Sequence, residues 1–112
     1  MSDSDPLNAA FAALAHPTRR AILARLAAGR ATVNELAEPF DASLPAISRH
    51  IRVLEDAGLV DREREGQFRP CKLNPQPILK IAQWTDQYRI IWEARFDALS
   101  NALQQMKDSG DA

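Results

Sequence analysis

Residues 43–52 bring together side chains that bind phosphates and nucleic-acid bases. The stretch contains Ser43, Ser48, Arg49 and Arg52 and has no acidic residue. Arginine presents a planar fork of donors that matches the O6 and N7 atoms of guanine or the oxygens of a phosphate. A serine hydroxyl can both donate and accept a hydrogen bond. These residues therefore suit the recognition of a nucleic acid through hydrogen bonds to its bases and phosphates.

A single helix over residues 44–57 is predicted to position these side chains. At about 100° per residue, its apolar stripe is expected to face the core. This stripe consists of Leu44, Ile47, Ile51 and Leu54. The outer face carries Pro45, Ser48, Arg49, Arg52 and Asp56, and Ala46 and His50 flank the stripe. Ser43 is the expected N-cap, Pro45 is tolerated in the first turn, and Gly58 ends the helix.

The outer face of this helix predicts a division of contacts on DNA. Because its leading residues are slim enough to enter a major groove, the expected base-side residues are Pro45, Ala46, Ser48 and Arg49. Phosphate contacts are expected from Ser43 at the helix start and from Arg52 one turn further on. His50 is undecided between a contact and a packed side chain. The alternative for the whole face is a solvated amphipathic helix, which also turns serine and arginine outward.

Two further helices are predicted at the start of the chain. Over residues 6–15, an apolar repeat at helical spacing consists of Leu7, Phe11 and Leu14. This helix ends at His16-Pro17, because the residue before a proline disfavours helical geometry. The second helix follows and is expected to end near Gly29. Its side chains expected to face the core are Ile22, Leu23 and Leu26.

A short helix and a turn link these helices to the one over residues 44–57. Thr32 and Glu35 have the spacing of a capping box, in which each side chain bonds the backbone amide of the other residue. This box is predicted to open a helix over residues 33–38, and residues 39–42 form a turn. Two helices joined by a tight turn are typical of a helix-turn-helix.

A β-hairpin is predicted next. Residues 59–65 and 68–73 are short, strand-like runs around Gly66-Gln67. Pro70 cannot donate to a strand ladder, so the second strand is expected to be an edge or to be interrupted there. The side chains expected to meet phosphates or a narrow minor groove are Arg62, Arg64, Gln67 and Arg69. The alternative is a ladder of solvated ion pairs with the intervening Asp61, Glu63 and Glu65.

Residues 75–106 are predicted to form one long helix or two abutting ones. Their apolar positions alternate three and four apart, close to the seam of a coiled coil. A helix of roughly 30 residues is longer than so small a body, so part of its apolar face needs a second chain. The residues expected at the dimer contact, in this helix and the first one, are Leu7, Phe11, Leu14, Ile81, Trp84, Tyr88, Ile91, Trp92, Phe96, Leu99 and Leu103.

Length and composition predict one globular domain. The chain has 112 residues, of which 46% are hydrophobic, and the core is expected over residues 7–73. No apolar run approaches the roughly 20 residues that cross a membrane, and the first residues do not resemble a signal peptide. A single cysteine, Cys71, cannot form an internal disulfide, which predicts a cytoplasmic location. The net charge is −1, but residues 16–30 contain four arginines and no acid. A basic face is therefore compatible with the nearly neutral charge of the whole chain.

Three segments together resemble the ArsR family of winged-helix repressors. They are residues 13–23 (ALAHPTRRAIL), 33–37 (VNELA) and 43–60 (SLPAISRHIRVLEDAGLV), and the resemblance runs over residues 7–73. It implies a mainly α-helical winged helix-turn-helix with a small β-hairpin and long terminal dimerisation helices. It also implies a homodimer that binds an inverted-repeat operator, with residues 43–52 in the major groove and the hairpin tip on adjacent backbone or minor groove.

The Arg19-Arg20 pair resembles the start of the second helix in this family. Phosphate contact and structural pairing are both open for these two arginines.

Many members of this family sense metal ions through clustered cysteines or through His, Asp and Glu pairs. Here the third helix has no cysteine, and the chain has one Cys and two His. No metal and no cofactor are therefore expected, and the resemblance is to the branch that does not sense metals. Asp86, Glu93 and Asp97 are interpreted as solvated charges. Cys71 is interpreted as a packed residue, with redox sensing as the alternative, and a small-molecule effector of unknown chemistry is open.

Two rival functions and an enzyme are the alternatives to a DNA-binding repressor. One rival is a winged-helix protein-interaction module without DNA binding, which the acid-free residues 43–52 disfavour. The other is a repressor released by a metal or redox signal. The sequence has no carboxylate pair with a partner histidine, no glycine-rich phosphate loop and no nucleophile motif, so no enzyme is expected.

Overall fold

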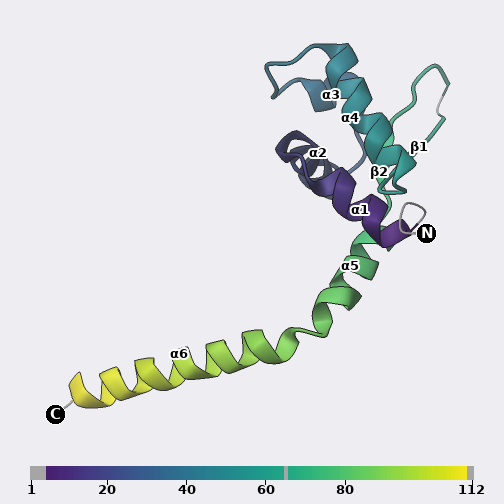
Figure 1. Ribbon diagram of the computed structural model, residues 1–112. Coiled ribbons are helices and arrows are strands. Elements are labelled where there is room, and N and C mark those ends of the chain that lie inside the picture. The colour runs from purple at the N-terminus through teal and green to yellow at the C-terminus, as the bar shows by residue number, and fades with distance from the viewer. Residues whose placement is uncertain (1–4, 65, 111–112) are drawn as a thin grey trace. The chain divides into compact units, whose positions relative to one another are not determined.

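The computed structural model describes residues 5–64 and 66–110, which form six helices and a two-stranded hairpin (Figure 1). The chain divides into two compact units, Met1–Ile81 and Ala82–Ala112. Helices α1 to α4 and the hairpin belong to the first unit, and α6 belongs to the second. Whether the whole chain acts as one domain stays a prediction.

Two capped helices begin the first unit. Helix α1 (Pro6–Leu14) is capped by the side chain of Asp5. Helix α2 (Pro17–Ala27) is capped by His16, whose Nδ1 accepts a hydrogen bond from the Thr18 amide at 3.1 Å. Proline occupies the first turn of both helices, where a backbone N–H has no partner to lose. The predicted break between the two helices is confirmed.

Helix α3 (Val33–Ala37) opens with the predicted capping box. The Thr32 hydroxyl accepts from the Glu35 amide at 3.2 Å, and the Glu35 carboxylate accepts from the Thr32 amide at 3.0 Å. Hydrogen bonding to this carboxylate by the Thr32 backbone amide, and next by the Thr32 side chain, holds the pKa of Glu35 below its ordinary value. A helix of only five residues depends on such caps, because few of its amides have partners within the helix.

Replacing Thr32 by alanine is expected to lower the free energy of unfolding by about 1 kcal/mol, because the hydroxyl that accepts from the α3 amide is lost. Urea unfolding followed by circular dichroism measures the change. Thr32→Ser keeps the hydroxyl and should stay close to the wild type. Equal stability of the alanine variant would show that the box contributes nothing.

Helix α4 (Leu44–Asp56) is the second helix of the helix-turn-helix. Ser43 caps it by accepting from the Ala46 amide at 3.2 Å. The helix stops before Gly58, whose φ of +78° is a left-handed conformation that favours glycine. The cap and the end of α4 both agree with the sequence prediction.

The hairpin is shorter than the sequence predicts. Strands β1 (Val60–Arg62) and β2 (Cys71–Leu73) pair antiparallel, with Arg62 opposite Cys71. Strand β2 begins only after Pro70, so the predicted interruption at that proline is confirmed. The other edge of β2 is covered by Ala31, which exchanges backbone hydrogen bonds of 3.0 and 2.7 Å with Cys71. The described residues between the strands, 63–64 and 66–70, are called the wing.

The core of the first unit lies between α2, α3, α4 and the hairpin. Its larger buried members are Ile22, Leu23, Leu26, Leu36, Ile47, Ile51, Leu54, Leu59, Val60 and Cys71. The expected inward residues of α2 and three residues of the α4 stripe are thereby confirmed. The expectation for Leu44 is wrong, since this side chain is 48% exposed. It is the first helical residue, beside exposed residues 41–43, and burial on α4 begins only at Ile47.

The C-terminal region forms two helices, which settles the alternative left open by the sequence. Helix α5 (Gln76–Asp86) and helix α6 (Arg89–Gly110) are separated by residues 87–88. Neither helix has a buried residue among those described. No helix in the described part of the chain is long and apolar enough to cross a membrane.

Candidate nucleic-acid interface

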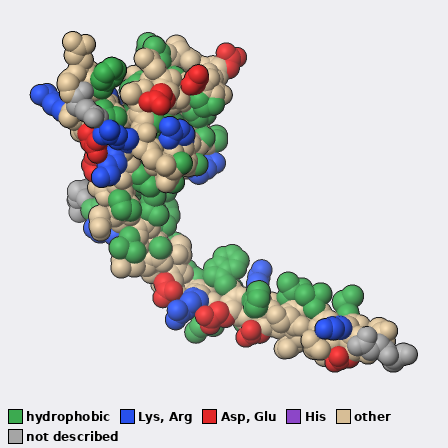
Figure 2. Space-filling model, turned by 180° about the vertical axis from the view of Figure 1, so that it is seen from behind, with side chains coloured by type: hydrophobic (Ala, Val, Ile, Leu, Met, Phe, Trp, Pro, Cys, Tyr) green, Lys and Arg blue, Asp and Glu red, His purple; other side chains and the backbone are tan. Residues whose placement is uncertain are grey.

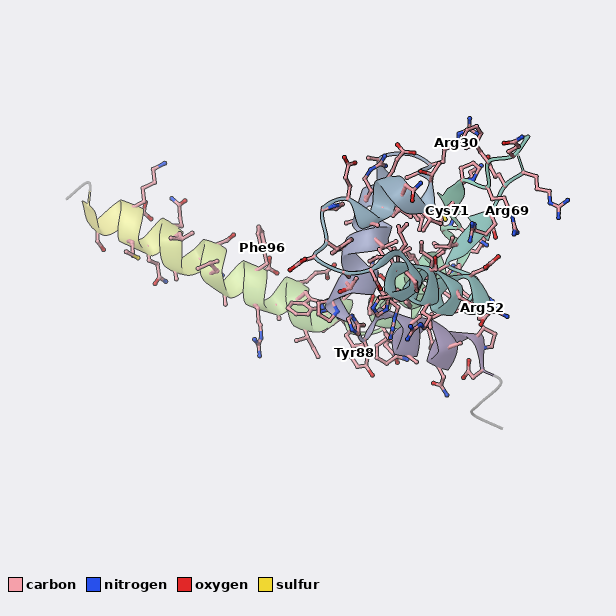
Figure 3. The ribbon with its side chains drawn as sticks, turned by 90° about the horizontal axis from the view of Figure 1, so that it is seen from above. Arg30, Arg52, Arg69, Cys71, Tyr88 and Phe96 are labelled. Atoms are coloured by element: carbon pink, nitrogen blue, oxygen red, sulfur yellow. The ribbon has the colours of Figure 1, made fainter. Side chains whose placement is uncertain are left out.

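The outer face of α4 presents hydrogen-bond donors without partners of their own. Ser48, Arg49 and Arg52 are exposed. Figure 3 labels Arg52 on this helix. Across residues 5–64 and 66–110, the structure gives no hydrogen bond or ion pair to either arginine side chain. Two guanidinium groups one turn apart are therefore available to a ligand rich in acceptors.

The start of α4 is compact and partly occupied by its own cap. Pro45 is exposed and Ala46 is half-buried, and Leu44, the first residue of the helix, is 48% exposed. The Ser43 hydroxyl accepts from the Ala46 amide. The same hydroxyl keeps a proton that it can donate to a phosphate oxygen.

His50 lies against α2 and its cap. Its Nδ1 is 3.3 Å from Nη1 of Arg19, and its ring centroid is 4.4 Å from that of His16. Loss of hydration lowers the pKa of His50, and the nearby basic groups of His16, Arg19 and Arg49 lower it further. His50 is half-buried. Of its two open interpretations, this geometry favours the packed side chain.

Arg19 and Arg20 both bond the last carbonyls of α1. Arg19 donates to Ala13 through Nε at 2.6 Å and to Ala12 through Nη2 at 3.2 Å, and Arg20 donates to the Leu14 carbonyl at 2.6 Å. The geometry supports structural pairing, which the sequence left open. Basic side chains satisfy helix C-terminal carbonyls in this way. The signal was the short break at His16-Pro17, which brings the first turn of α2 next to the end of α1.

The wing contains exposed and structural side chains. Arg64, Gln67 and Arg69 are exposed, and Figure 3 labels Arg69 beside the hairpin. The Nε of Arg62 donates to the Arg69 carbonyl at 3.3 Å, and this bond joins the two sides of the wing. Phe68, which the sequence analysis missed, is 68% exposed.

Among the described residues, the ion pairs of the hairpin do not join the partners of the predicted ladder. Glu63 pairs with Arg30 at 2.9 Å and with Lys72 at 3.9 Å. Glu65 lies outside the described residues. Arg64 and Arg69 are not part of this pairing. Their positive charges can therefore act on a phosphate backbone.

The residues expected at a dimer contact differ in their exposure. Leu7 is half-buried, Phe11 is 38% exposed, and Leu14 packs against the core of its own protomer, where Ala10 and Ala13 are also buried. Ile81 is half-buried. In the second unit Trp84 and Tyr88 pack edge to face at 5.4 Å. The exposed members of the set are Phe11, Trp84, Tyr88, Ile91, Trp92, Phe96, Leu99 and Leu103.

Helix α6 carries a continuous apolar stripe. Spaced alternately four and three residues apart, its members are Trp92, Phe96, Leu99, Leu103 and Met106, each between 56% and 70% exposed. Figure 2 shows hydrophobic side chains gathered along one edge of this helix. Away from the stripe, Arg89 pairs with Asp86 and Glu93 at 3.8 and 3.4 Å. An exposed stripe of this length is typical of a surface that binds another protein chain.

Cys71 and the acidic residues are the remaining candidates for metal or redox chemistry. In the part of the chain that the structure describes, no three His, Cys, Asp or Glu side chains lie together as a candidate metal site. Cys71 is fully buried, and this burial raises the pKa of its thiol. A buried thiol with a raised pKa is poorly reactive, which supports the interpretation of Cys71 as a packed residue.

Comparisons with known proteins agree with this geometry. A family described as a helix-turn-helix domain matches residues 14–63. The transcriptional repressor SdpR of Bacillus subtilis is 37% identical over 78 residues, which cover 70% of this chain and 87% of SdpR. The HTH-type transcriptional regulator Rv2034 of Mycobacterium tuberculosis is 37% identical over 102 residues, 91% of this chain and 90% of Rv2034. The crystal structure of the ArsR family transcriptional regulator RHA00566 superposes with a TM-score of 0.72 at 44% identity, covering 80% of this chain and 98% of that one.

The fold and the site define a winged helix-turn-helix protein in which α4 exposes two arginines, Arg49 and Arg52. The chain belongs to the ArsR family of transcriptional regulators. The family resemblance and the fold class predicted from the sequence are therefore confirmed.

Proposed function

We propose that this protein is a cytoplasmic, homodimeric repressor of transcription that binds an inverted-repeat operator. Its activity is binding, without a catalytic step. In this proposal α4 enters the major groove, where Arg49 reads guanine and Pro45, Ala46 and Ser48 lie along the base edges. Ser43 and Arg52 hold the flanking phosphates.

One observation carries the proposal. The exposed guanidinium of Arg49 has no partner among the described residues and projects from the first two turns of a capped helix. A helix that enters the major groove contacts base edges with its N-terminal residues. The acid-free outer face of residues 43–52 adds no repulsion toward phosphates.

Dimerisation supports operator binding by supplying a second α4. The apolar stripe of α6 is exposed in the protomer and has the spacing that packs against a like helix. Two recognition helices related by a two-fold axis then meet half-sites about 34 Å apart, one helical turn of DNA.

Binding to a defined duplex tests the proposal. The duplex is the DNA immediately upstream of the protein's own gene, or one selected by the protein from a random pool, and a scrambled duplex of equal composition is the control. A gel shift should show preference for the test duplex by a factor of about 10³ or more at physiological salt. Equal binding of both duplexes would leave only a non-specific binder, and no binding would favour the protein-interaction module.

The exposed arginines of the wing are expected to contribute mainly through phosphates. Arg69→Ala should weaken binding to test and scrambled duplexes by the same factor and reduce the salt slope by about one. Fluorescence anisotropy over a series of salt concentrations measures both quantities. Lys107→Ala, which removes a positive charge from the last turn of α6, is the matched control and should leave the slope unchanged. A selective loss on the test duplex would instead indicate that Arg69 reads sequence.

A further inference from the structure

Arg19 joins the end of α1 to the middle of α4. Two of its nitrogens donate to the carbonyls of Ala12 and Ala13, and the third faces Nδ1 of His50 at 3.3 Å. All three nitrogens of one guanidinium are thereby used. Because the guanidinium is planar and rigid, these contacts fix how α4 lies against α1.

His50 completes this arrangement in one protonation state. A guanidinium has donors and no acceptor, so Nδ1 of His50 must accept and the single ring proton must lie on Nε2. A doubly protonated ring would place an N–H against the N–H of Arg19. The Arg19–His50 bond therefore exists only while His50 is neutral.

The surroundings of His50 favour the neutral ring. The charged and titratable groups that act on it are His16 and Arg19, at the start of α2, and Arg49 on its own helix. Helix α1 has no charged side chain. His16 already uses its Nδ1 to cap α2, which holds its ring against that of His50. All the groups that act on His50 are thus basic.

We propose that Arg19 is a positioning residue for DNA binding: through the neutral imidazole of His50 it sets the orientation of α4, so that operator affinity falls when His50 gains a proton. This inference rests on the proposed function. Arg19 touches no DNA in this account, and it acts through His50 and the backbone of α1. The competing role for His50 is direct contact with a phosphate.

The two roles predict opposite effects of pH. An imidazolium attracts a phosphate, so direct contact would strengthen as the solution becomes acidic. The positioning role of Arg19 predicts the opposite, that affinity for DNA falls as the solution becomes acidic. Because the pKa of His50 is lowered in the folded protein, the unfolded chain binds this proton more readily. The contribution of the contact is complete above the ordinary histidine pKa and is lost as the pH falls below it.

The test measures affinity for a duplex that the wild-type protein has selected from a random pool, at constant ionic strength, from about pH 8 down to about pH 5.5. His50→Asn keeps an acceptor near the position of Nδ1 and cannot be protonated in this range. Both proteins carry His16→Asn, which removes the other histidine ring while asparagine keeps the cap of α2. The protein with His50 should lose roughly fivefold in affinity on acidification, and His50→Asn should stay level.

Arg19 variants show whether the pH effect passes through this residue. When Arg19→Ala is added to both proteins, the one that keeps His50 and the one that carries His50→Asn should have the same pH dependence. Arg19→Lys keeps the charge but has a single nitrogen for three acceptors. It replaces Arg19→Ala in this comparison if the alanine variant does not fold. Circular dichroism at each pH verifies that the proteins compared are folded.

Two results of the binding test would overturn the inference and leave the proposed function standing. One is an affinity that rises on acidification, and the other is a pH dependence that is equal with and without His50. The ¹⁵N shifts of the His50 ring give a readout without DNA. A proton on Nδ1 at neutral pH would also overturn the inference. If the wild-type protein selects no duplex at any pH, the proposed function fails and the inference fails with it.

Discussion

Leu99→Glu is expected to convert the protein to a monomer and to weaken operator binding by roughly a hundredfold or more, because a monomer contacts one half-site only. Leu99 lies at the centre of the α6 stripe and is 58% exposed in the protomer. A carboxylate there would be buried without a partner when two copies meet. Sedimentation equilibrium measures the mass, and anisotropy measures the affinity for the duplex.

A matched control separates the position of the new charge from the charge itself. Asn101→Glu adds a carboxylate on the opposite side of α6, about half a turn away from the stripe. It should leave the dimer and the affinity close to those of the wild type. A dimeric Leu99→Glu with unchanged affinity would show that α6 is not the contact between copies.

Arg49→Ala is expected to cost about 1–3 kcal/mol of operator binding for each half-site and to relax the preference at one base pair, because a bidentate contact with guanine is lost. The side chain is exposed and has no partner among the described residues, so the stability of the fold should not change. Anisotropy on a set of duplexes, each with one base pair replaced, measures affinity and preference together.

Arg52→Ala provides the contrast within the same helix. Its guanidinium is expected on a phosphate, so all duplexes should be bound more weakly by one common factor. Affinity and base preference that are both unchanged in Arg49→Ala would refute its assignment to a base.

The elements of the helix-turn-helix were predictable because their signals are local. The capping box at Thr32 and Glu35, the cap at Ser43 and the stop at Gly58 each involve residues a few positions apart, and each has the expected bonds or backbone conformation. Periodicity also located the buried face of α4. It could not show which turn of the helix lies over the core, and for that reason Leu44 was placed wrongly.

Contacts between distant residues were not predictable from the sequence. Arg19 and His50 are 31 positions apart, and no local sequence signal in either segment predicts their contact. The same holds for Arg30 and Glu63, which are 33 apart. The outer face of α4 is a different case, because solvent exposure follows from the helical pattern alone. Contacts of this face with DNA are intermolecular, so the sequence predicts them only through the chemistry of the exposed side chains.

Methylation interference on the selected duplex tests the central claim most directly, since a methyl group on guanine N7 lies in the major groove where α4 is expected to bind. Interference is expected at guanines in two symmetric clusters about one helical turn apart, and one guanine in each cluster should lose its effect in Arg49→Ala. Interference spread evenly along the duplex, or an unchanged pattern in Arg49→Ala, would contradict reading of the major groove by this helix.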